Sequence, residues 1–315
     1  MSYVLTLFIV EIALLLLGAV GFVFAINIAR RYDKNLATTE QFNLAKNGYL
    51  VSTIIAFMLV VKLPLFLYFI WTMDMMSSFV PGAMCSAGIV SATNYGVPMF
   101  FLKIIILFLL CGWLLIHYED SKTLDSKFLR LKFRLFIPLF LLLILEFVLE
   151  FMHFKGISLD RPVDCCSNLF SNVITQESKF WQSDKFIVTL FYTLFIGVIL
   201  SAWFKKDLFL SIFSPLFMVL TWQALIRFFS TYVYELPTHK CPYCLLQADY
   251  GYIGYLIYIL IFLGTLPGFF ILILKMLGSE QKAFFYKLSI SSNLALCIIL
   301  SSYPVSYYIK NGVFL

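Results

Sequence analysis

Residues 97–116 have the sequence VPMFFLKIIILFLLCGWLLI, in which Lys103 is the single charged side chain. The hydrocarbon core of a bilayer is about 30 Å thick, and an α-helix crosses it with about 20 mostly apolar residues. This stretch has that length and that composition, so it predicts a transmembrane helix.

Seven further runs of the same kind surround it, and the whole composition agrees with them. Hydrophobic residues make up 62% of the chain, charged residues 13%, and the mean hydropathy is +0.93, values far from those of soluble domains. The first run has no small-residue cleavage pattern and is too long for a signal-peptide core, so we expect it to be retained as a span. We therefore expect an all-α polytopic membrane protein with about eight transmembrane helices, forming a single bundle over residues 1–315. The expected spans are 3–29, 48–73, 97–116, 135–153, 185–203, 208–229, 249–274 and 284–304.

Lysine and arginine are distributed unevenly among the connections between these spans. Cytoplasmic loops carry an excess of Lys and Arg close to the ends of transmembrane helices. We therefore place both termini outside, with loops 74–96, 154–184 and 230–248 on the outer, periplasmic face of a cytoplasmic (inner) membrane. The cytoplasmic side has fourteen basic residues, Arg30, Arg31, Lys34, Lys46, Lys122, Lys127, Arg130, Lys132, Arg134, Lys205, Lys206, Lys275, Lys282 and Lys287, against six outside, Lys155, Arg161, Lys179, Lys185, Lys240 and Lys310.

Most of the cysteines fall in the loops that this orientation places outside. That side of the membrane is oxidising, and disulfides form and exchange there. Two others, Cys111 and Cys297, lie within spans, where a buried thiol is commonly a packing residue. The outer-loop cysteines are Cys85, Cys165, Cys166, Cys241 and Cys244.

Residues 241–244 have the sequence CPYC, and a redox role is the leading interpretation. A Cys-x-x-Cys unit can close a small reversible disulfide, and a helix N-terminus lowers the pKa of a thiol placed there. We expect Cys244 to lead directly into the span at 249–274, and His239 and Lys240 to favour the thiolate further.

Two other interpretations of CPYC stay open. A zinc or copper site needs further ligands, and the available ones are Cys165, Cys166, His239 and His153, in addition to Cys241 and Cys244. A permanent disulfide within the turn is the second, although it closes a loop too short to give much entropic stabilisation.

The first outer loop adds a second motif, PGAMCSAGIVSATNYGVPMFFLK at residues 81–103. Taken with CPYC before a later span, it resembles the vitamin K epoxide reductase family and its quinone-linked bacterial homologues. The resemblance covers two short segments, and the chain departs from the family in having more spans and a single cysteine in this loop. It implies that Cys241 and Cys244 form the pair beside a quinone, that Cys85 shuttles electrons from an outer thiol protein, and that Ser91 lies near the quinone.

Ionisable residues within the spans form a further set of candidates. Such residues are costly in lipid, usually face the bundle interior and are often functional. We expect Glu146 and Glu150, which share a helix face, to pair with Lys103 or Arg227, either in a proton path or quinone-polarising site or as structural ion pairs. The ionisable residues expected in the outer half are Glu11, Lys103, Glu146, Glu150 and Arg227, whereas Lys62 is expected outside that half.

Tyr255 and Tyr258 are three residues apart and could line a quinone pocket, although tyrosines also form belts at membrane interfaces.

The leading hypothesis is a membrane thiol–disulfide oxidoreductase that passes electrons between outer-face cysteines and a quinone. The alternatives are a copper or zinc binding or transport protein, and a structural or assembly subunit with loop disulfides. The expected partners are the lipid bilayer and an outer-face thiol protein, whereas the sequence does not predict an oligomeric state. The net charge of +6 follows largely from the cytoplasmic bias of Lys and Arg, so it gives no support to nucleic-acid binding.

Overall fold

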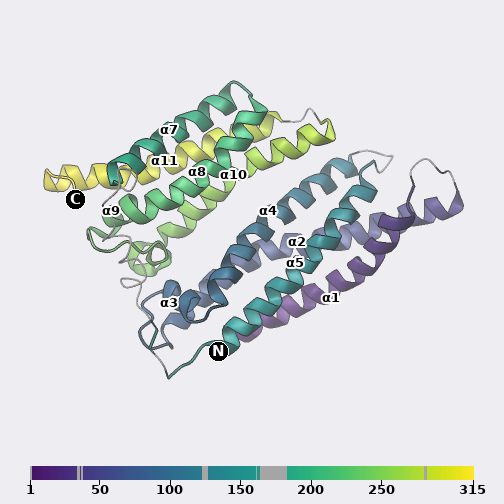
Figure 1. Ribbon diagram of the computed structural model, residues 1–315, viewed down its shortest axis with the longest axis horizontal. Coiled ribbons are helices and arrows are strands. Elements are labelled where there is room, and N and C mark those ends of the chain that lie inside the picture. Colours follow the sequence, from purple (N-terminus) through teal and green to yellow (C-terminus); the bar gives the residue numbers. More distant parts are fainter. Residues whose placement is uncertain are drawn as a thin grey trace. The chain divides into compact units, whose positions relative to one another are not determined.

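The computed structural model of the protein describes residues 2–33, 36, 38–122, 127–160, 162–163, 183–279 and 282–315. All regular elements within these ranges are helical, and eight of the helices are long and apolar enough to cross a membrane (Figure 1). The prediction of an all-α polytopic membrane protein is confirmed. Within loop 154–184, residues 161 and 164–182 lie outside the described residues, and Cys165 and Cys166 are among them.

The chain divides into two compact units. The first consists of Met1–Val80 and Ile89–Arg161, and the second of Pro81–Gly88 and Pro162–Leu315. The short segment Pro81–Gly88, which carries Cys85, thus belongs with the C-terminal half of the chain. That the two units together form one bundle over residues 1–315 stays a prediction.

Four long helices build the first unit. Helix α1 packs against α2 and α5, and α4 packs against the same two helices, so that the four form a closed ring of neighbours (Figure 1). Their bounds are Ser2–Arg31 for α1, Thr39–Ser77 for α2, Gly96–Ser121 for α4 and Leu129–Gly156 for α5, with the short α3 at Ser86–Ser91.

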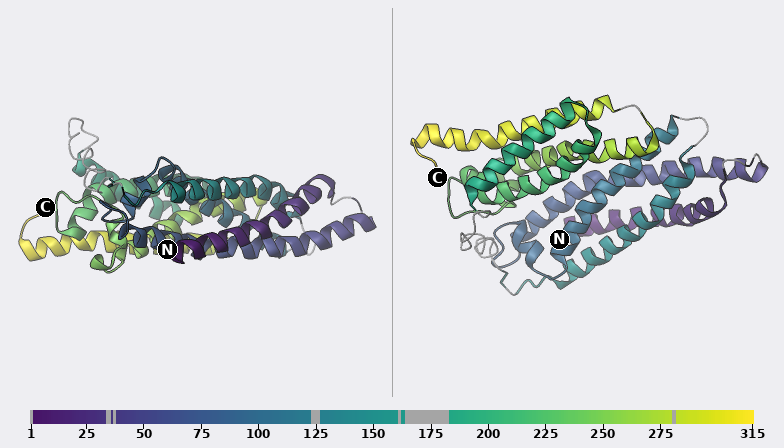
Figure 2. Two further views of the ribbon diagram at one scale, coloured as in Figure 1. Left: turned by 90° about the horizontal axis from the view of Figure 1, so that it is seen from below. Right: turned by 45° about the horizontal axis from the view of Figure 1, so that its top comes forward.

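The second unit repeats this order of helices. Helix α7 packs against α8 and α11, and α10 packs against the same two, so the first, second, third and fourth long helices have the same neighbours as in the first unit. The right-hand view of Figure 2 shows the helices of each unit running alongside one another. The bounds are Asp184–Trp203 for α7, Asp207–Ala224 for α8, Leu225–Phe229 for the π-helical turn η2, Ser230–Tyr234 for α9, Ile253–Leu277 for α10 and Ala283–Asn311 for α11.

Several helices extend beyond the spans expected from hydropathy, most of all α2. It begins at Thr39, where hydropathy placed the start of the span at residue 48. The Thr38 side chain accepts a hydrogen bond from the Gln41 backbone amide at 3.4 Å. This is the arrangement of an N-cap, which satisfies an amide that has no partner inside the helix. The pattern Thr-x-x-Gln at residues 38–41 was the available sequence signal.

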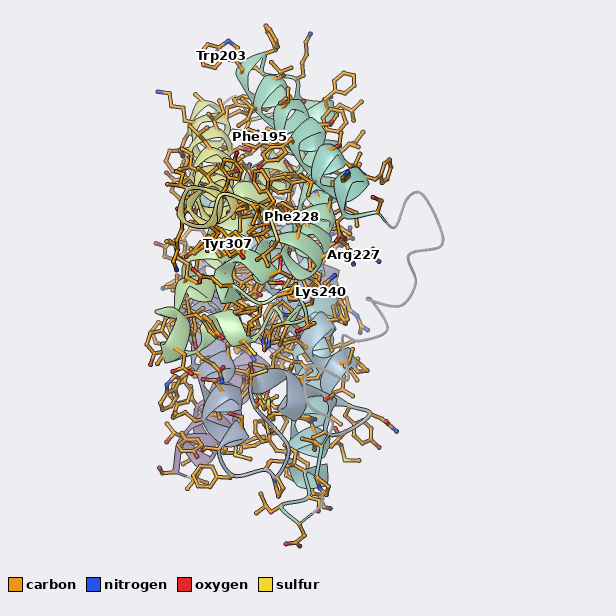
Figure 3. All side chains as sticks on the ribbon, turned by 90° about the vertical axis from the view of Figure 1, so that its left-hand side faces the viewer. Phe195, Trp203, Arg227, Phe228, Lys240 and Tyr307 are labelled. Atoms are coloured by element: carbon orange, nitrogen blue, oxygen red, sulfur yellow. The ribbon has the colours of Figure 1, made fainter. Side chains whose placement is uncertain are left out.

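Aromatic side chains fill the interior of the second unit. The ring of Phe191 lies 5.2 Å from those of both Phe217 and Phe229, centroid to centroid, and all three are fully buried. Figure 3 shows Phe195 among these packed helices, whereas Trp203 projects outward and is 70% exposed. Large exposed apolar side chains are expected on a surface that faces lipid.

Candidate functional site

The CPYC segment lies in a connection between α9 and α10. Cys244 begins a 3₁₀ turn at Cys244–Leu246, a second turn follows at Ala248–Tyr250, and α10 starts only at Ile253. Gly251 and Tyr252, with φ of 63° and 56°, reverse the chain between them. The expectation that Cys244 leads directly into a spanning helix is therefore wrong.

Two tyrosine hydroxyl groups hold the CPYC backbone instead. Tyr234, the last residue of α9, donates a hydrogen bond to the Cys241 carbonyl oxygen. Tyr258, in α10, donates to the Pro242 carbonyl oxygen at 2.6 Å. The turn is thus fixed from both sides by the helices that it connects.

Cys85 reaches the same region on the segment Pro81–Gly88. The Gln247 side-chain amide donates to the Met84 carbonyl oxygen at 2.8 Å, which ties this segment to the connection that carries CPYC. A Cβ atom at Gly82 would lie 2.4 Å from the Val163 carbonyl oxygen, and the φ of this glycine is +82°. The close approach and the left-handed backbone together require glycine at that position.

Three sulfur atoms meet as a result, and we call Cys85, Cys241 and Cys244 the thiol centre. The Sγ atoms of Cys85 and Cys241 are 3.6 Å apart, and the three Sγ atoms all lie within 4.8 Å of one another. None of these three cysteines forms a disulfide bond, and all three are buried. A disulfide bond has an S–S distance of about 2.05 Å, so a modest movement would join Cys85 to Cys241.

The immediate surroundings of the thiol centre are aromatic. Burial, and then the neighbouring Cys241 and Cys85, raise the pKa of Tyr243, so its hydroxyl group stays protonated. The His239 ring packs edge to face on Tyr234 with centroids 4.4 Å apart. Its Nε2 atom is buried and has no hydrogen-bond partner among the described residues.

The other residues predicted as quinone-site residues or metal ligands do not form one group with the cysteines. Tyr258 holds the CPYC backbone, whereas the Tyr255 ring packs on Tyr252 with centroids 6.3 Å apart. Ser91 ends α3 and is half-buried. His153, a ligand in the alternative metal site, lies in the first unit, where its Nδ1 atom is 2.6 Å from the Thr93 hydroxyl oxygen.

The first unit has its own buried polar group, which we call the ionic cluster: Glu11, Lys62, Lys103, Glu146 and Glu150. Lys62 Nζ lies 2.6 Å from a Glu11 carboxylate oxygen and 3.0 Å from Glu146. Lys103 Nζ bonds to Glu146 and lies 2.8 Å from Glu150. All five side chains are buried.

This cluster differs in two members from the expected one. Lys62, expected outside the outer half of the bundle, is joined to Glu11 and Glu146, because α2 packs against α1 and α4 at this depth. Arg227 belongs to the second unit, in the turn between α8 and α9 (Figure 3). Lys103 does pair with Glu146 and Glu150, which was one of the two pairings that the sequence suggested.

The structure contains a further buried ion pair that the sequence did not predict. Lys132 Nζ lies 2.7 Å from an Asp120 carboxylate oxygen and joins α5 to α4. The Trp113 indole donates to the Lys132 carbonyl oxygen at 2.8 Å. Hydropathy placed both charges in a loop, and nothing in the local pattern indicated that they would be buried.

The fold and these two groups of residues define a class: a multi-pass helical membrane protein with a buried group of thiols and a buried ionic cluster. Comparison with protein-family models, curated proteins and solved structures finds no match.

Proposed function

We propose that the protein is a membrane thiol–disulfide oxidoreductase whose working group is the thiol centre. The observation that supports this most directly is the 3.6 Å separation of the Cys85 and Cys241 sulfur atoms. Thiol–disulfide exchange requires a thiolate to approach one sulfur of a disulfide in line. Cys241 has a possible partner on each side, Cys85 in space and Cys244 along the chain.

The exchange steps are written here for the direction in which an outer dithiol protein is oxidised. A thiolate of an outer protein attacks a Cys85–Cys241 disulfide at Cys85, which releases the Cys241 thiolate and forms a mixed disulfide. The second thiol of that protein then attacks the mixed disulfide, so that the protein leaves oxidised and Cys85 leaves as a thiol. The Cys85–Cys241 disulfide is then regenerated from a Cys241–Cys244 disulfide. The Cys85 thiolate attacks that disulfide at Cys241, which forms Cys85–Cys241 and releases Cys244 as a thiolate.

Restoring the Cys241–Cys244 disulfide needs an acceptor of two electrons, and we propose a membrane quinone. The chemistry that it would supply is the uptake of two electrons and two protons from the dithiol. A group of aromatic side chains supports this proposal: Trp222 lies 5.5 Å from Tyr258 and 6.4 Å from Tyr243, centroid to centroid. These half-buried aromatic faces lie directly beside Pro242 and could pack on such a ring.

Because the thiols are buried, the proposed exchange requires a movement of the chain. Because Cys85, Cys241 and Cys244 are each at most 3% exposed, an outer protein reaches Cys85 only when the segment Pro81–Gly88 moves. The contact between Gln247 and Met84 is then the first interaction that must open.

A copper or zinc protein is the second candidate, supported by the spacing of the same three sulfur atoms. Metal–sulfur bonds of about 2.3 Å place three sulfurs about 4 Å apart in a trigonal site, and the three Sγ atoms lie within 4.8 Å of one another. Thiolate ligands favour Cu(I) and zinc. The third ligand would be Cys85, which the metal site expected from the sequence did not include.

Mapping of disulfides in the full-length protein, purified in detergent, separates the two candidates. Free thiols are alkylated before and after addition of a water-soluble quinone, and the modified peptides are identified by mass spectrometry. We expect a dithiol-reduced protein to lose alkylation at Cys241 and at one of its two partners, Cys244 or Cys85, when the quinone is added, while Cys111 keeps its state.

The oxidoreductase proposal fails if the three thiols alkylate equally with and without quinone. The metal proposal is supported instead if the protein holds stoichiometric copper or zinc that is lost in a Cys85→Ser variant. A Cys297→Ser variant is the matched control, since Cys297 lies in α11 and outside the thiol centre.

A further inference from the structure

The ionic cluster of the first unit has an unequal number of charges. Three carboxylates, from Glu11, Glu146 and Glu150, face two ammonium groups, from Lys62 and Lys103. Lys103 also lies 4.4 Å from the centre of the Phe69 ring, a contact that favours the charged form of a lysine. An unpaired charge at this depth is costly, so a neutral cluster requires one more positive charge.

Glu150 is the carboxylate with the fewest partners. Glu146 contacts both lysines, and Glu11 contacts Lys62 through both oxygen atoms. Glu150 contacts one lysine through Oε2, and its Oε1 atom is fully buried with no hydrogen-bond partner among the described residues. A buried carboxylate oxygen without a partner carries the full cost of its desolvation.

The interior leaves room for very little else. A cavity of about 10 Å³ lies among Glu11, Lys62, Lys103 and Glu146, which is about the smallest volume that holds one water molecule. Because the two lysines already occupy the space between the carboxylates, a proton is the smallest charge that completes the cluster.

His153 lies one turn further along α5, on the same helix face as Glu150. It is fully buried, and its Nε2 atom has no partner among the described residues. Its Nδ1 atom contacts the hydroxyl group of Thr93, which is half-buried in the connection before α4. Gly96 makes room for the ring, since a Cβ atom there would lie 2.7 Å from His153.

From this geometry we infer that the ionic cluster is a binding site for a single proton, held on Glu150 and exchanged with water past His153 and Thr93. The charged groups that face Glu150 are Lys103 from α4, Glu11 from α1 and Glu146 from α5 itself; Lys62 from α2 contacts the other two carboxylates, and His153 lies one turn further along α5. Binding of the proton changes the cluster from a net charge of −1 to zero and involves no electron. The inference does not depend on the proposed thiol chemistry in the second unit.

Infrared spectroscopy of the purified full-length protein tests this directly. A protonated carboxyl group gives a carbonyl stretch that a carboxylate lacks, and the band shifts in heavy water. We expect the unmodified protein to show this band and to lose it as the pH is raised. The Glu150→Gln variant loses the band, whereas Glu235→Gln, which removes an exposed carboxylate paired with Lys310, keeps it.

A second variant separates proton binding from a general effect of mutation. Glu146→Gln leaves two carboxylates facing two ammonium groups, so Glu150 becomes ionised and the band disappears at neutral pH although Glu150 is still present. In His153→Gln the band remains, and its shift in heavy water becomes slower. An unmodified protein without the band at acid and neutral pH overturns the inference, as does a band that persists unchanged in Glu150→Gln or in Glu146→Gln.

Discussion

Cys85 and Cys241 differ from ordinary buried thiols because each has another sulfur within reach. Cys111, buried in α4, shows the ordinary case, since it belongs to no group of metal-ligating or redox partners among the described residues. A small buried thiol of that kind acts as an apolar packing residue. The proposed reactivity of the thiol centre therefore rests on the meeting of two loops and not on burial.

The Cys244→Ser variant should accumulate a disulfide between Cys85 and Cys241. In the unmodified protein the Cys244 thiolate can attack this bond at Cys241, and serine cannot replace it in that attack. Mild oxidation followed by digestion and mass spectrometry should identify the cross-linked peptide pair. A Cys111→Ser variant should show no such accumulation, and a Cys244→Ser protein with both thiols free after oxidation would refute the prediction.

Lys103 is the residue of the ionic cluster whose loss should cost the most stability. Lys103→Met keeps an unbranched side chain but leaves the three buried acidic side chains of the cluster facing a single ammonium group. Removing one partner of a buried ion pair typically costs about 3–5 kcal/mol. Thermal unfolding in detergent should therefore show a large decrease in melting temperature.

The matched control for Lys103→Met is Lys122→Met. Lys122 pairs with Glu119 at 2.7 Å near the end of α4, where its side chain is 29% exposed. Such partly exposed pairs contribute about 0–1 kcal/mol, so this variant should unfold close to the temperature of the unmodified protein. Equal stability losses in the two variants would contradict the account of the cluster.

At the scale of elements, the connection between α9 and α10 shows where sequence reasoning succeeds and where it fails. Hydropathy identified the spans because apolar length is a local property of the chain. It could not identify the two 3₁₀ turns after Cys244, since the sequence LLQADYGY continues the apolar and aromatic character of α10. The tyrosine hydroxyl groups that hold CPYC could not be identified either, because a donor 7 or 16 residues away along the chain is specified by packing.

Close contact between α8 and α10 should make Gly268 intolerant of a side chain. A Cβ atom there would lie 2.6 Å from the Ser214 hydroxyl oxygen and 2.9 Å from the Leu210 carbonyl oxygen. The neighbouring Ser211 hydroxyl group donates to the Gly268 carbonyl oxygen at 2.9 Å, which fixes the separation of the two helices. Gly268→Ala should therefore cost about 1–3 kcal/mol, the usual cost of overpacking, measured by thermal unfolding.

Gly197→Ala is the control for this substitution. A Cβ atom at Gly197 of α7 would lie 3.5 Å from the Phe213 ring, an ordinary van der Waals contact. This variant should match the unmodified protein or exceed it in stability, because alanine favours a helix more than glycine does. A Gly268→Ala protein as stable as Gly197→Ala would show that the α8–α10 contact is not tight.

At the scale of the whole molecule, the two units have the same order of four long helices with the same neighbours. The sequence shows no repeat that would have predicted this similarity. The reason is physical: lipid-facing positions accept almost any apolar residue, so two bundles can keep one packing order without similar sequences. In both sets of four long helices, the connection between the second and third helices carries part of the thiol centre: Cys85 lies between α2 and α4, and CPYC lies between α9 and α10, although Cys85 itself belongs to the second unit.

This arrangement gives the orientation in the membrane a direct test. Four spans separate the two cysteine connections, so both face the same side whichever way the chain is inserted. The bias of Lys and Arg predicts that this side is outside and that Leu315 is outside as well. Alkaline phosphatase is active only after export, so a fusion after Leu315 should be active and a fusion after Lys122 inactive. The reverse pattern would place the thiol centre on the reducing side of the membrane, where stable disulfides are rare, and would favour the metal-binding candidate over the oxidoreductase.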